Sequence, residues 1–383
     1  MTDKSVEKPQ ATPDGRPRRR LLWILVWCTA AVLVVCAGAG GYVFWRLNDN
    51  LRTVDINGAL GADRPADTGT MNILLLGSDS RSGSNGKLAG GSTGGTARSD
   101  TAMVIHVNQA HTKADIVSIP RDTLVSRPSC TATKDGSTLP AATGVMFNTA
   151  YEVGGPVCAV KTVEALTGLR MDHYIELDFS GFAKLIDALG GVTVTTTVDI
   201  DDAKSGLHLE AGTHHLNGTQ ALAFVRTRHG VGDGSDLGRI ELQQQMMKSV
   251  LTKVEGMGLL SDPVKLLSIA DTATSALTTD SQLGSVSSLV SLAEGMKGIK
   301  ADDITGVTMP NMTAPSDPNR LVPLQPQADA LWAALARDQP VPASVLRVQE
   351  ADPATTPSPS AGPTGPATNT ATAAATGPGT AGE

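Results

Sequence analysis

Three short apolar segments of this sequence each adjoin a pair made of one arginine and one aspartate. The pairs are Asp79 with Arg81, Arg98 with Asp100, and Arg121 with Asp122. Guanidinium groups bind phosphate oxygens through paired hydrogen bonds, and carboxylates suit hard cations such as Mg²⁺. A further basic group follows much later in the chain, formed by Arg226, Arg228 and Arg239. Because these arginines exceed what one phosphate needs, the combination predicts a pyrophosphate site.

The apolar segments beside these pairs have the length and composition of β-strands. Residues 71–76 form a continuous apolar run, which is typical of a strand buried on both faces. Residues 114–119 are rich in β-branched side chains and end at Pro120. Ligands collect at the carboxyl ends of strands in open α/β sheets, so the charged pairs are expected to meet at one edge of a sheet.

Helices and strands alternate along the rest of the predicted domain. Apolar residues follow helical spacing over 160–169 and over 182–189, where Ser180 is the expected N-cap, and residues 173–179 alternate like a strand. Residues 124–147 are expected to be irregular. We therefore predict a mixed central β-sheet sandwiched between α-helices, an α/β/α domain.

Arg239 is expected on the buried face of a helix that starts near Leu237. The stripe that shares this face by 3–4 spacing is Arg239, Gln243, Met246 and Val250. The first turn of a helix also favours a bound anion. Arg226 and Arg228 diverge on a helix and converge on extended chain, so the helix that Asn217 caps should end near Arg226 if both bind one ligand.

The N-terminal part of the chain predicts a membrane anchor. Residues 21–45 hold no charged side chain, which is enough for a helix across the ~30 Å hydrocarbon layer. The basic block at 16–20 predicts a cytoplasmic N-terminus and an extracytoplasmic remainder. A cleaved signal would have a shorter apolar region, and Val35 is too bulky to precede a lipoprotein cysteine at Cys36. We expect a cytoplasmic tail (1–20), a transmembrane helix (21–45), an extracytoplasmic linker (46–69), a catalytic domain (70–345) and a disordered tail (346–383).

Charge and motif content exclude several classes of protein. The formal net charge is −7, and the first 20 residues carry +3, so the remainder carries −10 and argues against nucleic-acid binding. The sequence has no zinc-ligand spacing, no Walker phosphate loop and no Gly-x-Ser-x-Gly elbow. The glycine-rich segment 82–95 is interpreted as a surface loop, with a phosphate-cradling loop as the alternative.

Cys130 and Cys158 are the two cysteines beyond the predicted membrane span. Because the compartment predicted for them is oxidising, we expect a disulfide between them, with two separate thiols as the alternative. Cys28 and Cys36 lie in the span and are interpreted as small apolar residues.

Several separate sequence blocks resemble the LytR-CpsA-Psr family, in the family's order and over roughly residues 70–310. They are residues 72–81, 98–100, 118–123, 172–174, 178–182, 189–192 and 216–228. One block departs from the family, because Leu242 precedes Gln243 and Gln244 where an arginine is usual.

The resemblance implies a transferase that moves a glycopolymer from a polyprenyl-pyrophosphate carrier to a peptidoglycan hydroxyl. The catalytic group would be Asp79, Arg81, Arg98, Asp100, Arg121 and Asp122. The pyrophosphate contacts would be Arg98, Arg121, Arg226, Arg228, Arg239 and Gln243. Asp79 and Asp100 are the candidates for holding Mg²⁺ or Mn²⁺. Asp122 is expected to orient Arg121, with a role as general base as the alternative. The prenyl chain of the donor would need an apolar slot, which the helices at 158–169 and 180–189 could supply together with the sheet; the alternative is that their apolar residues are only core, and they are not assigned to the site. The alternatives are a polyprenyl-pyrophosphate phosphatase and a non-catalytic wall-polymer-binding or regulatory protein.

Overall fold

A seven-stranded sheet lies at the centre of the computed structural model, which describes residues 16–78, 99–228, 236–258 and 262–350. In spatial order its strands are β1 (Arg52–Val54), β14 (Leu277–Asp280), β9 (His173–Asp178), β2 (Met71–Ser78), β3 (Ser99–Val107), β4 (Ala114–Ser118) and β15 (Ile304–Thr308). The strands that the charged pairs adjoin, β2, β3 and β4, are therefore consecutive neighbours.

Strand directions bring the ends of these strands to one edge of the sheet. β3 runs antiparallel to both β2 and β4, whereas β9 is parallel to β2 and β15 is parallel to β4. The carboxyl ends of β2, β4, β9 and β15 therefore share an edge with the amino end of β3. We call this the carboxyl edge, and it is the edge at which the sequence places the three charged pairs.

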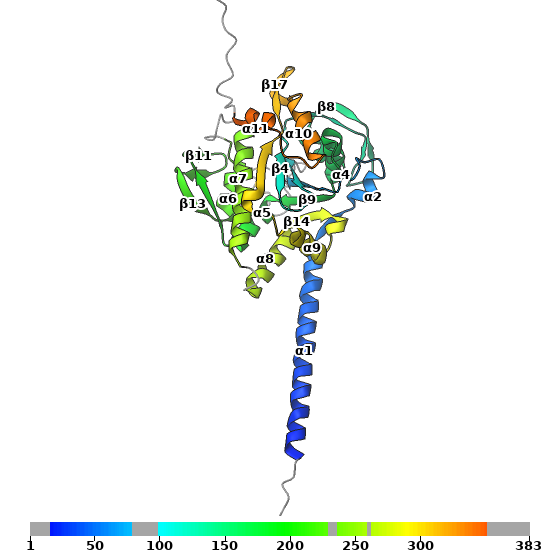
Figure 1. Cartoon of the computed structure of the whole chain (residues 1–383), viewed down its shortest axis with the longest axis vertical. Helices are drawn as coiled ribbons and strands as arrows, with labels where there is room; N and C mark the ends of the chain where they lie inside the picture. The colour runs from blue at the N-terminus through cyan, green and yellow to red at the C-terminus, as the bar shows by residue number, and fades with distance from the viewer. Residues whose placement is uncertain (1–15, 79–98, 229–235, 259–261, 351–383) are drawn as a thin grey trace, which may run out of the picture. The chain divides into compact units, whose positions relative to one another are not determined.

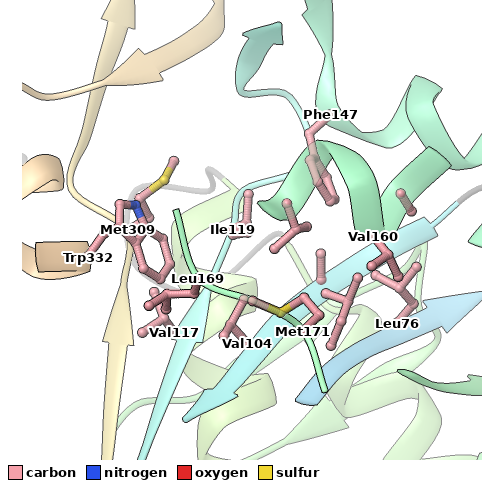
Figure 2. Packing of buried hydrophobic residues seen from close by; sticks show 14 of the residues in the cluster. Leu76, Val104, Val117, Ile119, Phe147, Val160, Leu169, Met171, Met309 and Trp332 are labelled. Carbon is pink, nitrogen blue, oxygen red and sulfur yellow. The ribbon is translucent and has the colours of Figure 1, made fainter. Parts of the chain in front are cut away.

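Helices cover both faces of the sheet, as predicted (Figure 1). One face packs against α4 (Phe147–Thr167) and α10 (Gln327–Leu335). Figure 2 shows this core, in which Leu76, Val104 and Val117 of the sheet lie among Phe147 and Val160 of α4. The other face carries α5 (Phe179–Ala188), α6 (Gly218–Arg226) and α7 (Asp236–Gly256), whose apolar residues form a second cluster. The mixed α/β/α prediction is confirmed.

Small two-stranded sheets lie outside the central sheet. They are β5 (Leu124–Arg127) with β8 (Ala142–Met146), β6 (Cys130–Thr131) with β7 (Thr138–Leu139), β10 (Val192–Thr196) with β13 (Gly212–Leu216), β11 (Ile200–Asp202) with β12 (Leu207–Leu209), and β16 (Asn311–Ala314) with β17 (Asp317–Pro323). The region 124–147 is thus regular, not irregular as expected. The expected disulfide joins Cys130 to Cys158, with an S–S distance of 2.02 Å, and so fastens β6 to α4.

The N-terminal helix α1 (Arg16–Asn50) is long and apolar enough to cross a membrane over Trp27–Asn50. It continues five residues beyond the expected end of the span at 45, and Arg46 and Asn50 hydrogen-bond to α8 (Pro263–Ala276). Residues 1–15 of the expected cytoplasmic tail (1–20) and residues 351–383 of the expected disordered tail (346–383) lie outside the described residues.

The expected linker at 46–69 is folded instead. β1 extends the central sheet, and α2 (Ile56–Leu60) buries Ile56 and Leu60 in the core beside α4. Arg64 pairs with Glu164 of α4, and the side chains are 3% and 4% exposed. This segment has few apolar residues, but strand pairing and a buried ion pair also hold it against the domain.

The remaining elements are two single-turn 3₁₀ helices and two α-helices. They are η2 (Ser281–Leu283), α9 (Val286–Met296), η3 (Ala301–Asp303) and α11 (Ala343–Glu350). The tail expected from 346 therefore starts no earlier than the end of α11.

Candidate active site

Asp100 and Arg121 meet at the carboxyl edge, although 20 residues separate them. Arg121 Nη1 lies 2.6 Å from Asp100 Oδ1, and Arg121 Nε lies 3.4 Å from Asp122 Oδ2. All three side chains are about a quarter exposed, at 21%, 24% and 25%. The contact from Asp122 has the geometry that the orienting role requires, because it restrains the guanidinium that also binds Asp100.

The first turns of α7 place Arg239 and Gln243 against β3. Arg239 is 3% exposed, and its Nη2 donates to the main-chain carbonyl of Asp100 at 2.9 Å. Gln243 Nε2 donates to Thr101 Oγ1 at 2.9 Å and to the Val225 carbonyl at 3.1 Å. One amide thus joins β3, α6 and α7. The buried stripe predicted for this helix is present, because Met246 is also buried at 2% exposure.

Arg226 and Arg228 lie where helix gives way to extended chain. α6 starts with a capping box formed by Asn217 and Gln220 and ends at Arg226, and Thr227 follows with φ −60° and ψ 135°. The helix therefore ends at Arg226, as expected if Arg226 and Arg228 bind the same ligand. Arg226 lies over the ring of Phe179, with 5.0 Å from its guanidinium carbon to the ring centroid. This cation–π contact helps to fix the guanidinium at the site.

The β11–β12 hairpin supplies functional residues that the sequence reasoning missed. The buried Asp202 carboxylate accepts hydrogen bonds from the main-chain N–H groups of Lys204 at 2.9 Å and Arg228 at 3.0 Å. Ser205 Oγ lies 2.8 Å from Thr227 Oγ1. The hairpin is therefore fastened to the segment 226–228 and carries Lys204 to the site. Its Asp-Asp-Ala-Lys-Ser-Gly sequence signals a turn, but nothing in it indicates which distant segment the turn contacts.

A cavity of about 220 Å³ opens between these elements. Its charged and polar lining includes Asp100, Lys204, Arg226, Arg228, Arg239 and Gln243. An adjoining pocket shares Asp100, Arg239 and Gln243 and is bounded by Arg121. Four cations thus line the main cavity, and one of its carboxylates, Asp202, is engaged by main-chain donors. A positively charged cavity of this kind suits a diphosphate.

Three of the predicted site residues, Asp79, Arg81 and Arg98, lie outside the described residues. The described ends of the strands that adjoin them, Ser78 and Ser99, are register partners at the carboxyl edge. The structure therefore brings together Asp100, Arg121, Asp122, Arg226, Arg228, Arg239 and Gln243.

Asp100 is the carboxylate at this edge whose surroundings fit a divalent cation. One of its oxygens accepts from Arg121, and the side chain lines the cavity where a phosphate would sit. Among the described residues, no group of three or more His, Cys, Asp or Glu side chains is placed to hold a metal. Mg²⁺ is commonly held by one or two carboxylates together with substrate phosphates, so these residues fit a cation that binds with the pyrophosphate.

Apolar surface adjoins the cavity on the face of the sheet toward α5, α6 and α7. The helices at 158–169 and 180–189 do not form one slot, because α4 and α5 pack on opposite faces of the sheet, and their apolar residues belong to the core as in the alternative interpretation. Leu74 and Leu76 face α4, so the alternation of a strand turns Leu75 to the other face. Leu75 and its neighbours Ile175 and Leu177 on β9 are only half-buried, although they lie on central strands. In the register of the sheet, Gly77 of β2 lies between Leu177 of β9 and Thr101 of β3. Thr101 lines the cavity, so this apolar surface lies next to it.

Leu242, which departs from the resemblance, is 5% exposed and belongs to the apolar cluster of α5, α6 and α7 with Phe224 and Met246. At this position the chain has core packing in place of a further cation.

Comparison with known proteins gives a consistent result. The sequence profile of the LytR_cpsA_psr family matches residues 45–337. The chain is 32% identical over 277 residues to the probable cell wall biosynthesis protein LcpB of Corynebacterium glutamicum, a match that covers 70% of this chain and 62% of that protein. It is 30% identical over 313 residues to the polyisoprenyl-teichoic acid–peptidoglycan teichoic acid transferase TagT of Bacillus subtilis, covering 78% of this chain and 90% of TagT. The solved LytR-Csp2A-Psr enzyme of Actinomyces oris superposes with a TM-score of 0.54 at 25% identity, over 74% of this chain and 96% of that one.

Proposed function

Because the chain belongs to the LytR-CpsA-Psr family, we propose that it is a membrane-anchored phosphotransferase that joins a glycopolymer to peptidoglycan. The donor is a polyprenyl-pyrophosphate-linked glycopolymer, and the acceptor is a peptidoglycan hydroxyl. The observation that carries the proposal is the cavity at the carboxyl edge, where Arg226, Arg228 and Arg239 face the same space as Asp100. Relatives named as teichoic acid transferases, such as TagT, support the same reaction class.

The reaction is substitution at the phosphorus that carries the sugar. The oxygen of the acceptor hydroxyl bonds to this phosphorus, the bond from the phosphorus to the bridging oxygen of the pyrophosphate breaks, and polyprenyl phosphate leaves. The hydroxyl proton is taken up by the departing phosphate or by water. Enzymes accelerate such transfers mainly by positioning the groups and by stabilising charge on the phosphoryl oxygens. Arg226, Arg228 and Arg239 bind the diphosphate, and Arg121 neutralises charge that develops in the transition state.

A divalent cation, Mg²⁺ or Mn²⁺, belongs to this proposal and would be held by Asp100. Asp79 is the second carboxylate expected from the sequence and lies outside the described residues. When bound, the cation supplies further positive charge beside the phosphate oxygens. Asp100 also holds Arg121, so the same side chain would position both positive groups.

The prenyl chain of the donor binds the half-buried apolar surface of Leu75, Ile175 and Leu177. This surface is the better candidate because it adjoins the cavity through the Gly77–Thr101 pair, whereas the α4 face is filled by its own core. Helix α1 anchors the protein as a single-pass span, with the basic N-terminus in the cytoplasm and the domain outside. The donor lipid then lies in the same leaflet as the domain.

The test is to incubate the full chain in proteoliposomes with a lipid-linked polymer donor and purified peptidoglycan. The proposal predicts polymer covalently attached to peptidoglycan, with a matching release of polyprenyl phosphate. Release of free polymer without attachment would instead identify a phosphatase and contradict the transferase. Binding of the donor with no turnover, in a chain with the normal thermal transition, would contradict both enzymatic functions.

A further inference from the structure

The outer end of α1 is fastened to α8 by a set of side-chain contacts. Arg46 donates from Nε and Nη2 to the two carboxylate oxygens of Asp271, at 3.0 and 3.1 Å. Asn50 Nδ2 donates to Asp271 Oδ1 at 3.1 Å and to Thr274 Oγ1 at 3.4 Å. Asn48 Oδ1 accepts from the main-chain N–H of Val286 at the start of α9. The domain is therefore held to the helix end through two of its own helices.

These contacts also fix the sense in which α8 runs. On α8, Arg46 contacts Asp271, whereas Asn50, one turn further along α1, contacts Asp271 and also Thr274, so the two helices run in the same sense where they touch. Followed back from Asp271, α8 therefore extends toward the apolar part of α1. At 1.5 Å per residue, Leu267 lies about 6 Å and Val264 about 10 Å further in that direction. Figure 1 shows this end of α8 projecting below the sheet, at the level of the upper part of α1 and to the left of it in this view.

The stripe of α8 that continues from Asp271 toward the membrane is apolar and exposed. At about 100° per residue, Val264 and Leu267 lie within roughly 40° of Asp271 around the helix axis. Val264 is 78% exposed and Leu267 is 40% exposed. The corresponding level of α1 carries Tyr42 and Trp45, each 60% exposed. Aromatic side chains of this kind mark the boundary between hydrocarbon and water at the end of a membrane span.

We propose that Val264 and Leu267 insert into the membrane leaflet at which α1 ends, so that α8 is a second attachment of the domain to the lipid bilayer. The occupant of this surface is lipid because the surface continues the lipid-facing surface of α1 at the same depth. Burying two aliphatic side chains in lipid is favourable, and α1 already supplies the proximity that a lone amphipathic segment would lack. The inference rests on α1 spanning the membrane, as proposed above.

A second attachment has a consequence for catalysis. Arg52, two residues after α1, pairs with Thr278, which in turn pairs with Glu176 near the end of β9. The chain therefore leaves the membrane at the carboxyl edge, where the candidate site lies. Fixing α8 in the leaflet would therefore restrain the tilt of this edge relative to the membrane.

The test is spin-label accessibility in the full chain reconstituted into nanodiscs. Nitroxide labels are attached to single cysteines at positions 264, 267 and 312, introduced by Val264→Cys, Leu267→Cys and Met312→Cys in a Cys28→Ala/Cys36→Ala background. Met312 is a matched control, since it is a 45% exposed apolar residue on β16, beside the β17 hairpin that Figure 1 places away from α1. A Cys28→Ala chain labelled at the native Cys36 reports on the span itself. Cys130 and Cys158 are bonded to each other and do not label.

We expect the ratio of oxygen to water-soluble nickel accessibility to be several-fold higher at 264 and 267 than at 312, and highest at 36. Labels at 264 and 267 that match position 312 while Cys36 remains lipid-exposed would overturn the insertion of α8 and leave the anchor intact. A water-exposed label at Cys36 would instead overturn the membrane span, and the inference with it.

Discussion

Arg121 Nη1 lies 2.6 Å from Asp100 Oδ1 and thereby joins the carboxyl end of β4 to the amino end of β3. Arg239, from α7, donates to the main-chain carbonyl of the same aspartate. Two cations from different elements are therefore held by one residue before any substrate binds. Such preorganisation lets the charges stabilise a transition state without a cost of reorientation during the reaction.

Replacing Arg121 with alanine should lower turnover of the lipid-linked donor by about 10²–10³-fold, the usual cost of losing one preorganised charge-stabilising group. The measurement is the single-turnover rate of polymer transfer, with the thermal transition as a check on folding. Arg320→Ala is the matched control, because Arg320 is a partly exposed arginine whose nearest carboxylate, in Asp317, lies at 3.9 Å. A folded Arg121→Ala chain with undiminished turnover would remove Arg121 from the site.

Asp202→Ala should weaken donor binding more than it slows transfer. The carboxylate holds the N–H groups of Lys204 and Arg228, so its loss frees the hairpin from the arginine segment and raises KM while kcat changes less. Leaving the buried donors unsatisfied should also cost about 1–3 kcal/mol of stability. Both effects are measured by steady-state kinetics and chemical denaturation. Asp201→Ala, whose side chain is 79% exposed, should change neither, and an equal effect of both substitutions would refute the positioning role.

Local sequence signals predicted those elements whose structure depends mainly on neighbouring residues in the chain. The apolar run before Ser78, the capping box at Asn217 and the stripe of Arg239 and Gln243 each depend on neighbouring residues, and each predicted element is present. The N-cap of α5 is Asp178, not Ser180, because its carboxylate accepts from the N–H of Gly181 at 2.7 Å. A two-residue error of this kind arises where several capping residues stand in succession.

The Cys130–Cys158 disulfide was expected from the sequence, but other contacts between distant segments were not readable from it. Asp202 meets Arg228 across 26 residues, and nothing in either segment signals the other. Residues 46–69 have the composition of a linker, yet Arg64 finds Glu164 across 100 residues. The prenyl surface could not be placed from the sequence, because periodicity shows that a helix has an apolar face without showing which face of the sheet it covers.

His106 should make stability depend on pH in the range just below neutrality. Its ring is 2% exposed, and burial lowers its pKa below the ordinary 6.5. The neutral ring, with Nδ1 2.7 Å from Asn72 Oδ1, is therefore the folded form. Because the unfolded chain takes up the proton first, the contribution to stability is present above pH 6.5 and is lost as pH falls through the lowered folded pKa.

The check is chemical denaturation of wild type and His106→Gln from pH 7.5 downward, where glutamine retains a donor for Asn72. The free energy of unfolding of wild type should fall more steeply below pH 6.5 than that of the variant. Burial also raises the pKa of Asp115 and Asp172. Asp115 is the cross-strand partner of His106, so the comparison is read between about pH 7.5 and 6, above the ordinary titration range of carboxyl groups. Parallel curves would show that His106 is not the titrating group.

Arg64 should be essential to the stability of the domain, although it lies in a segment with the composition of a linker. Its guanidinium donates to Glu164, to Asn57 Oδ1 and to the main-chain carbonyl of Met171, and the Glu164 carboxylate also accepts from the Met171 N–H. Removing one partner of a buried pair leaves the other charge without compensation and typically costs about 3–5 kcal/mol.

Arg64→Ala should therefore lower the free energy of unfolding by about that amount, measured by denaturant titration of the full chain in detergent. Arg170→Ala is the control, because Arg170 is 39% exposed and lies 4.0 Å from Asp172, where an ion pair contributes at most about 1 kcal/mol. Equal, small losses for the two variants would mean that the segment before β2 is a tether after all. A large loss for Arg64 alone would mean that the folded domain starts directly after α1, with no flexible spacer between α1 and the site.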